Sequence, residues 1–285
     1  MILITGAKGQ LGYDFQKLFD SLRIQYTATD ADTLNITDSA AIEKFFSINP
    51  TPEIIINCAA YNNVDKAESE TEVCKKLNCL APIELAKYAK KIGCTFVTYS
   101  TDFVFDGLKN APYTEEDKTN PLSVYAKTKR DGEIGVLAEY DKVFVIRTSW
   151  VFGIANKNFN TQAIEWSKAK NELNIVTDQI SAPTYSKDLA SSSWQLINSG
   201  KFGLYHITNQ GECSKYDQAA YLLNKIGWNG RLNKAQTKNF PTPAKRSSYT
   251  KLSCKKLENA IGYKMPSWQN AIDRYIDALK EFKKL

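Results

Sequence analysis

The sequence predicts an α/β fold, built on a doubly wound parallel sheet with a smaller C-terminal lobe. In the first half, short apolar strands alternate with amphipathic helices, which is typical of a parallel sheet covered by helices on both faces. A glycine-rich turn at residues 6–12 separates the first strand from the first helix. The 285 residues exceed the usual size of one hydrophobic core, so one large domain or two closely packed ones are expected.

The alternating elements follow one another closely up to residue 147. Strands are predicted at residues 2–5, 25–29, 53–57, 95–99 and 142–147. Helices are predicted at residues 10–22, 38–48, 71–92 and 121–140. Asp38 suits the N-cap of the second helix, because its carboxylate can accept hydrogen bonds from free backbone N–H groups there. Gly93 suits the position just after the C-terminus of the third helix, because glycine readily adopts the left-handed conformation that is common there.

After residue 147 the alternation becomes less regular. Helices are predicted at residues 158–169, 186–198, 214–226 and 267–283, and short strands at residues 173–177 and 203–207. We expect residues 1–150 to form the first domain and residues 151–285 mainly the second. Some of the later segments are expected to return to the first domain.

Composition and charge exclude several classes of protein. The net charge of +6 comes from scattered Lys and Arg residues, whereas a nucleic-acid-binding stripe would be concentrated. No apolar run is long enough for a membrane span, and no secretory signal precedes the first strand, so a cytoplasmic location is expected. None of the six cysteines forms a C-x-x-C pair, and they are expected to be reduced thiols. The sole histidine, His206, lies in a predicted strand and is expected to be structural, so no metal site is predicted.

The glycine-rich turn predicts a dinucleotide site of the Rossmann type. Its residues are Thr5-Gly6-Ala7-Lys8-Gly9-Gln10-Leu11-Gly12, between a strand and a helix. Glycine allows a tight turn and a close approach to a pyrophosphate, whose charge a helix N-terminus favours. The alternative is a tight structural turn without a ligand. The predicted cofactor contacts in this turn are Gly6, Gly9, Gln10, Leu11 and Gly12.

Two further strand ends carry candidate cofactor contacts. Asp30 closes the second strand, where a carboxylate can accept hydrogen bonds from ribose hydroxyls and repel a 2′-phosphate. This favours NADH, although neighbouring side chains could still admit NADPH, and a simple turn aspartate is the alternative. Cys58, Ala59 and Ala60 follow the third strand, and their small side chains would let the cofactor lie close to the sheet.

Tyr125 and Lys129 stand four residues apart on a predicted helix, so their side chains share one face. A nearby ammonium group stabilises a phenolate, and we therefore expect Lys129 to lower the pKa of Tyr125 toward neutrality. Such a pair suits a proton donor and a cofactor contact. If this motif stood alone, a Tyr–Lys pair on the protein surface would be the default interpretation.

These motifs occur one after another at successive strand ends. Because of this order of motifs, the chain resembles a known family. It is similar to the extended short-chain dehydrogenases and, within them, to the dTDP-4-dehydrorhamnose reductases, over almost its whole length. The most specific segments are Val64-Asp65-Lys66-Ala67-Glu68, Tyr99-Ser100-Thr101-Asp102-Phe103-Val104-Phe105, Arg147-Thr148-Ser149-Trp150-Val151, Asp178-Gln179, Ala182-Pro183-Thr184 and Pro241-Thr242-Pro243-Ala244 with Arg246.

The resemblance implies an NAD(P)H-dependent oxidoreductase that reduces the C4 keto group of dTDP-4-dehydro-L-rhamnose to dTDP-L-rhamnose, for surface polysaccharide synthesis. It implies a catalytic set of Thr101, Tyr125 and Lys129. It also implies contacts to the nucleotide-sugar in residues 101–103 and the second half. For Trp150 a core aromatic is the alternative, and for Arg246 a solvated charge. The implied substrate contacts are Thr101, Asp102, Phe103, Trp150, Asn158 and Arg246.

Departures from the family pattern leave the exact sugar open. Ser247 stands where the family usually has proline, and Tyr61-Asn62-Asn63 stands where a threonine-containing pair is common. Other nucleotide-sugar 4-ketoreductases, an epimerase, or a non-catalytic regulatory subunit of the same fold remain alternatives. Some relatives bind magnesium at a dimer contact, where Asp14 matches one position. A full ligand set is not evident, so no required metal is predicted, and a homodimer remains open.

Overall fold

A central parallel sheet organises the computed structural model, which describes residues 1–282 and 284–285. Within that part of the chain the sheet has six strands in the order β10-β5-β4-β3-β1-β2. Every pairing between neighbouring strands is parallel, which confirms the predicted doubly wound α/β fold. The strands are β1 (Ile2–Thr5), β2 (Tyr26–Thr29), β3 (Ile54–Asn57), β4 (Thr95–Thr101), β5 (Val143–Thr148) and β10 (Gly203–His206).

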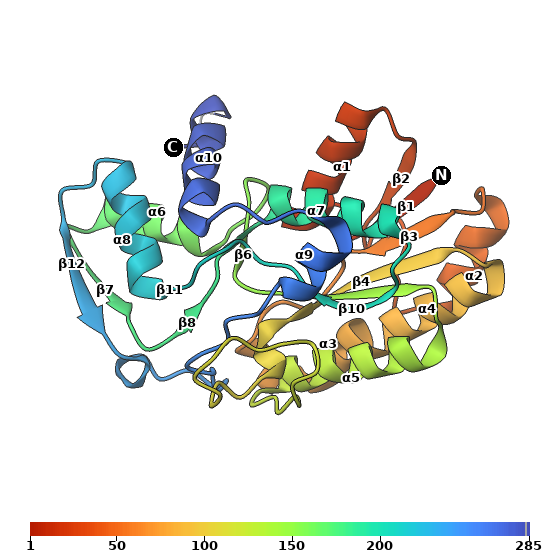
Figure 1. Ribbon diagram of the computed structural model, residues 1–285, viewed down its shortest axis with the longest axis horizontal. Coiled ribbons are helices and arrows are strands. Elements are labelled where there is room, and N and C mark those ends of the chain that lie inside the picture. The colour runs from red at the N-terminus through yellow and green to blue at the C-terminus, as the bar shows by residue number, and fades with distance from the viewer. Residues whose placement is uncertain (283) are drawn as a thin grey trace.

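Helices cover both faces of this sheet, because successive strand side chains point to opposite faces. Ile2 and Ile4 enter one hydrophobic core, whereas Leu3 between them enters the other. Figure 1 shows the two helical layers on either side of the strands. The first core packs under α1 (Gln10–Leu22), α7 (Ser186–Ser199) and α9 (Lys255–Ile261). The second packs under α2 (Ser39–Ile48), α4 (Ala81–Ile92) and α5 (Val124–Glu139).

Segments from the second half complete the first lobe. Strand β10 pairs with β5, and α7 packs against α1. Apart from these elements and α9, most of the second half forms the smaller lobe at the left of Figure 1, with a core rich in aromatic side chains such as Phe152, Tyr185 and Tyr275. Its helices are α6 (Phe159–Ala169), α8 (Lys215–Lys225) and α10 (Trp268–Glu281). The predicted end of the last helix at residue 283 lies outside the described residues.

The sequence patterns missed most strands of the smaller lobe. Two-residue strands are too short to show an alternating pattern, and β12 is polar and partly exposed. The paired strands are β6 (Val151–Phe152) with β9 (Thr184–Tyr185), β7 (Glu172–Val176) with β12 (Arg231–Ala235), and β8 (Ile180–Ser181) with β11 (Cys213–Ser214). Short 3₁₀ turns lie at η1 (Lys66–Glu68), η3 (Asp102–Val104) and η4 (Thr237–Asn239).

The predicted helix 71–92 contains an irregular turn. Helix α3 (Thr71–Lys75) runs through a π-helical turn, η2 (Lys76–Leu80), into α4. Pro82 lacks the N–H group that would bond the carbonyl of Asn78 in a regular helix. That carbonyl lies against Gly132 of α5, where a Cβ atom would approach it to 2.3 Å. The carbonyl group of this irregular turn therefore leaves room only for a glycine at residue 132 of the neighbouring helix α5.

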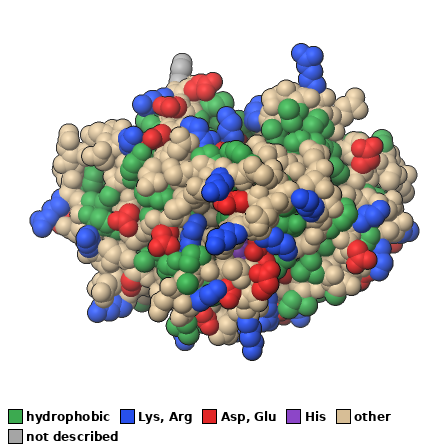
Figure 2. Space-filling view, viewed as in Figure 1, with side chains coloured by type: hydrophobic (Ala, Val, Ile, Leu, Met, Phe, Trp, Pro, Cys, Tyr) green, Lys and Arg blue, Asp and Glu red, His purple; other side chains and the backbone are tan. Residues whose placement is uncertain are grey.

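Charge is mixed over the surface. On the face in Figure 2, Lys and Arg side chains alternate with Asp and Glu rather than forming one basic patch. Among the described residues, no helix is both long and apolar enough to cross a membrane. The same residues contain no group of three or more His, Cys, Asp or Glu side chains placed to hold a metal ion.

A buried ion pair joins β5 to α5 behind the strand ends. Arg147 NH2 lies 2.7 Å from Glu133 Oε2, and both side chains are at most 5% exposed. His206 Nε2 lies 3.4 Å from Arg147 NH1. Burial and the Arg147 charge lower the pKa of His206 to about 3, so the imidazole is neutral. His206 is part of this buried cluster.

We predict that Glu133→Ala strongly destabilises the protein, because it leaves the Arg147 guanidinium buried without a counter-charge. Removing one partner of a buried pair costs about 3–5 kcal/mol in unfolding free energy. Urea unfolding should detect this loss. The control is Glu139→Ala on the same helix, which removes an exposed pair with Lys90 and should cost at most about 1 kcal/mol. Equal losses in the two variants would contradict the prediction.

Candidate active site

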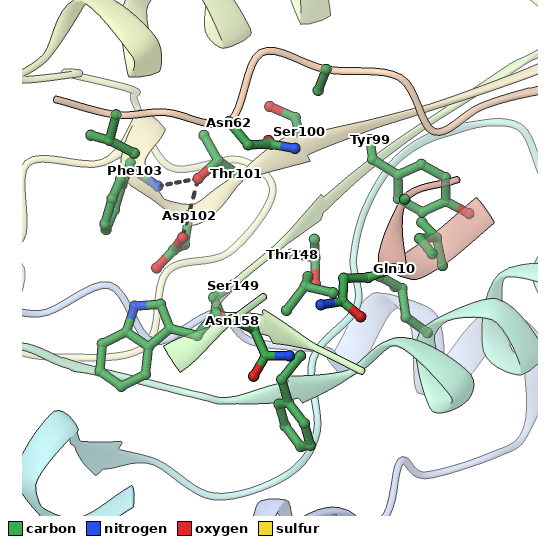
Figure 3. Close-up of a pocket in the computed structure, with 18 of the residues that line it drawn as sticks. Gln10, Asn62, Tyr99, Ser100, Thr101, Asp102, Phe103, Thr148, Ser149 and Asn158 are labelled. Carbon is green, nitrogen blue, oxygen red and sulfur yellow. Dashed lines mark hydrogen bonds between the residues drawn. The ribbon is translucent and has the colours of Figure 1, made fainter. Parts of the chain in front are cut away.

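A cavity of about 570 Å³ opens at the carboxyl ends of the strands. In open parallel sheets, ligands bind at this edge, where the strand order reverses. Here the reversal falls between β1 and β3, which are neighbours in the sheet. Figure 3 shows side chains from several strand ends and from the second lobe pointing toward this space. Thirteen predicted residues line it: Gly9, Gln10, Leu11, Cys58, Ala59, Ala60, Thr101, Asp102, Phe103, Tyr125, Lys129, Trp150 and Asn158.

A smaller cavity of about 330 Å³ adjoins the first. It is lined by Gly6 and Asp30, and it shares Gly9 and residues 58–60 with the larger cavity. The glycine turn therefore lies between the two spaces. Gly12 and Arg246, by contrast, line neither of them.

The glycine turn is closely packed. Gly6 has φ +67°, and a Cβ atom on it would lie 2.5 Å from the backbone nitrogen of Ala59. A Cβ atom on Gly12 would lie 2.3 Å from the carbonyl oxygen of Gly6, so Gly12 allows the helix to pack on the turn. Helix α1 starts after Gly9 without a side-chain cap. Its first N–H groups are therefore suited to bind an anion.

Unsatisfied polar groups collect around the larger cavity. Buried polar atoms normally have hydrogen-bond partners, and those without one suggest a ligand. Among the described residues, four such atoms belong to residues that line this cavity: Gln10 Oε1, Ser100 Oγ, Thr148 Oγ1 and Gln218 Oε1. Together with the uncapped helix and the glycine turn, they fit a dinucleotide bound along the strand ends.

Asp30 lies at the edge of the smaller cavity. Its carboxylate accepts hydrogen bonds from the backbone N–H groups of Lys8, at 2.9 Å, and Ala31, at 2.8 Å. These bonds fix the carboxylate close to the glycine turn. The Lys8 ammonium pairs with Asp32 at 2.7 Å, so a cation also stands beside Asp30.

Tyr125 and Lys129 lie on the first turns of α5, which begins at residue 124 rather than at the predicted residue 121. Two side chains cap this helix start. Ser123 Oγ accepts from Ala126 N at 3.3 Å, and Glu68 Oε1 accepts from Val124 N at 2.9 Å. Glu68 thus links the Val64–Glu68 segment to the helix that carries Tyr125.

The pKa of Tyr125 shifts in the direction opposite to our expectation. Burial raises it above its ordinary value, and the nearby Thr101 only partly opposes this. Lys129 Nζ instead donates to the carbonyl oxygen of Tyr99 at 2.5 Å. Burial lowers the pKa of Lys129 to about 8. The expected lowering of the Tyr125 pKa by Lys129 is therefore wrong, because burial is the largest cause of the shift and the Lys129 ammonium is not among the groups that act on this phenol.

The end of β4 holds Thr101, Asp102 and Phe103. Thr101 Oγ1 donates to Asp102 Oδ1 at 3.2 Å and accepts from Phe103 N at 3.2 Å, as Figure 3 shows. Asp102 Oδ2 accepts from Ser181 Oγ at 3.0 Å and from Thr250 Oγ1. Burial raises the pKa of Asp102 to about 6, and these hydroxyl donors oppose the rise. Asp102 thus fastens β4 to two loops of the second half.

Trp150 follows β5 in a conformation that non-glycine residues rarely adopt, with φ 46°. Such strain persists where the surrounding structure enforces it, frequently at functional sites. Asn158 is the N-cap of α6, because its side chain accepts from the backbone of Asn160 and Thr161. Its amide nitrogen donates to Gly153 O at 2.8 Å, so both ends of the side chain already have partners.

Sequence reasoning missed three residues at the site. Lys215 and Gln218, on the first turn of α8, line the cavity. Asn78 exchanges hydrogen bonds of 2.8 and 3.0 Å with the backbone of Tyr61, next to the cavity residue Asn62. A lysine or glutamine early in a helix, or an asparagine within one, gives no signal in a single sequence. Their proximity to the cavity depends on the packing of distant segments.

Arg246 forms an ion pair with Asp65. Its NH2 lies 2.7 Å from Asp65 Oδ2, and its NH1 lies 3.1 Å from Asp65 Oδ1. The pair lowers the pKa of Asp65. The next residue, Ser247, donates to Phe105 O at 2.6 Å, a bond that the usual proline could not make. The loop that carries Arg246 is thus attached to the first lobe at two points, through Arg246 with Asp65 and through Ser247 with Phe105.

Residues 1–281 match the family described as the RmlD substrate binding domain. Among curated proteins, the dTDP-4-dehydrorhamnose reductase of Aggregatibacter actinomycetemcomitans is 37% identical over 286 residues. That alignment covers 95% of this chain and 96% of the relative.

Solved structures agree with this match. The crystal structure of a dTDP-4-dehydrorhamnose reductase from Clostridium acetobutylicum has a TM-score of 0.95 and 39% identity, covering 98% of this chain and 99% of that one. The Bacillus anthracis dTDP-4-dehydrorhamnose reductase in complex with NADP has a TM-score of 0.94 and 31% identity. It covers 97% of this chain and 98% of that one.

We predict that Asp30→Ala improves the use of NADPH relative to NADH. The substitution removes a carboxylate that would repel a 2′-phosphate and leaves Lys8 beside the site. The measurement is the ratio of kcat/KM values for the two cofactors. Asp20→Ala, which removes an exposed carboxylate that lines neither cavity, is the matched control. An unchanged ratio in Asp30→Ala would show that Asp30 does not contact the ribose.

We predict that Arg246→Met raises the KM for the nucleotide-sugar about tenfold or more, with little change in cofactor affinity. The ion pair with Asp65 offers a way to separate direct contact from loop anchoring. Asp65→Asn keeps the guanidinium but removes its counter-charge. If Arg246 contacts the substrate directly, Asp65→Asn should leave the KM nearly unchanged. If both variants raise the KM equally, Arg246 acts by anchoring its loop.

Proposed function

Because this chain belongs to the family described as the RmlD substrate binding domain, we propose that it is an NAD(P)H-dependent oxidoreductase that reduces dTDP-4-dehydro-L-rhamnose to dTDP-L-rhamnose. The observation that carries this proposal is one cavity that brings Thr101, Tyr125 and Lys129 together with the glycine turn. The relatives named dTDP-4-dehydrorhamnose reductase match along nearly the full chain, which supports the same reaction. The product would serve surface polysaccharide synthesis in the cytoplasm.

The two lobes divide the binding between them. Residues 1–150 hold the dinucleotide through the glycine turn, Asp30 and residues 58–60. Residues 151–285 mainly hold the nucleotide-sugar. Either NADPH or NADH is accommodated, since Asp30 favours a free 2′-hydroxyl while Lys8 and the NADP-bound relative favour the phosphate.

When bound, the reduced nicotinamide supplies a hydride to C4 of the sugar. Thr101 Oγ1, whose single proton goes to Asp102 in the structure, would turn to donate it to the carbonyl oxygen at C4 and so orient that oxygen. Tyr125 gives its phenolic proton to the same oxygen as charge develops there. Burial keeps this phenol protonated until the reaction, which suits a proton donor. Lys129 then stabilises the phenolate and bonds the nicotinamide ribose.

The departures from the family pattern bear on which sugar is bound. Asn62, from the segment that departs from the family pattern, lines both cavities. A different side chain there would favour a different hydroxyl arrangement, so another 4-keto-6-deoxyhexose remains the second candidate. Comparing reduction rates over a panel of nucleotide-linked keto-sugars separates the candidates, and an epimerase would show no net oxidation of the cofactor.

We predict that Tyr125→Phe lowers kcat by about 10²–10⁴-fold, because it keeps the ring but deletes the proton. Single-turnover hydride transfer from NADPH to the keto-sugar measures the effect. Cofactor affinity, followed by fluorescence titration, should stay nearly normal. Lys129→Met should lower both the rate and the cofactor affinity, because Lys129 has two roles. Near-normal turnover by Tyr125→Phe would remove this tyrosine from the mechanism.

A further inference from the structure

Lys215 stands between two cavities. It is the first residue of α8 and lines both the 570 Å³ cavity and a neighbouring one of about 450 Å³. Phe159 is also shared by the two. The second cavity lies in the smaller lobe, and its apolar walls are Phe159, Trp166, Leu173, Ile175, Val176 and Phe240. A ligand that occupied both cavities would therefore pass Lys215.

The ammonium group of Lys215 rests on aromatic rings instead of a carboxylate. Its Nζ lies 3.5 Å from the ring centroid of Trp150 and 4.5 Å from that of Phe159. Within the described part of the chain, this ammonium has no hydrogen bond or ion pair. Asp102 is the carboxylate that acts on the pKa of Lys215, but its oxygens already accept hydrogen bonds from three hydroxyl groups. Ring faces attract a cation and leave its N–H groups available to an anion.

The electrostatic surroundings agree with an anionic ligand. Burial lowers the pKa of Lys215 to about 7, and Arg246 adds to this, whereas Cys213 and Asp102 oppose it. A half-buried ammonium without a counter-charge is destabilised by desolvation. An anion placed beside it would restore the pKa and keep the proton on the lysine.

We propose that Lys215 binds the diphosphate of the nucleotide-sugar, at the point where the nucleoside and the sugar separate into the two cavities. This inference rests on the proposed function and names the residue that positions its substrate. The base and its ribose then enter the apolar cavity, while the keto-sugar lies beside Trp150 in the larger one. Gln218, on the same first turn of α8, also lines the larger cavity, and its Oε1 has no hydrogen-bond partner among the described residues.

The test measures binding of dTDP and thymidine by calorimetry, so that no turnover is needed. Lys215→Met should weaken dTDP binding on the order of ten- to hundredfold, because a charge-assisted contact is lost. Thymidine, which lacks the phosphates, should bind equally to both proteins. Lys215→Arg should retain most of the affinity for dTDP. Lys225→Met, at the exposed end of the same helix, is the matched control and should change neither affinity.

The pH dependence gives a second readout. Between about pH 7 and 9 the free lysine loses its proton, so dTDP affinity should fall with rising pH in the native protein. Lys215→Met should lack this fall. Unchanged dTDP affinity in Lys215→Met, or an equal loss for thymidine, would overturn the inference. If dTDP binding depends on Lys215 but no keto-sugar is reduced, the inference stands and the proposed reaction fails.

Discussion

The close contact between Gly6 and the backbone of residues 58–59 is the constraint on which the site depends. It occurs at the reversal of strand order, where β1 and β3 lie side by side. A side chain at Gly6 would push the two strand ends apart. Because the contact is so close, the uncapped start of α1 and the small residues after β3 border the same two cavities. The rest of the site is arranged around this edge.

The second half of the chain is held to that edge by polar contacts as well as by packing. Asp102 is bonded to Ser181 and Thr250, and Arg246 pairs with Asp65. Strand β10 and helix α7 add apolar contacts by joining the first lobe itself. These connections make the cavity a property of both lobes. They also explain why Asp102 and Arg246, which resemble ligand contacts in sequence, have protein partners in the structure.

Polar groups around the cavity are kept in states that cost stability. In the described part of the chain, four buried oxygen atoms that belong to cavity residues lack partners, Trp150 has a strained backbone, and both Lys129 and Lys215 have lowered pKa values. Each of these states is unfavourable without a ligand. A bound dinucleotide and nucleotide-sugar would supply hydrogen bonds and negative charge at the same places. The same burial that raises the pKa of Tyr125 keeps its proton available for transfer.

Local signals in the sequence predicted most of the first lobe, because hydrophobic periodicity and the glycine turn can be recognised without tertiary contacts: strands β1 to β5 and helices α1, α2 and α5 lie close to their predicted ranges. Helix α9, which also packs on this lobe, was not predicted. Local spacing also placed Tyr125 and Lys129 on one helix, and both of them line the larger cavity. Which groups meet at the site depends on the packing of distant segments. Lys215 lies more than sixty residues from Trp150 along the chain, yet the two are in contact. The pKa direction of Tyr125 was likewise decided by burial, since desolvation depends on every segment packed around a group and not on its neighbours in sequence.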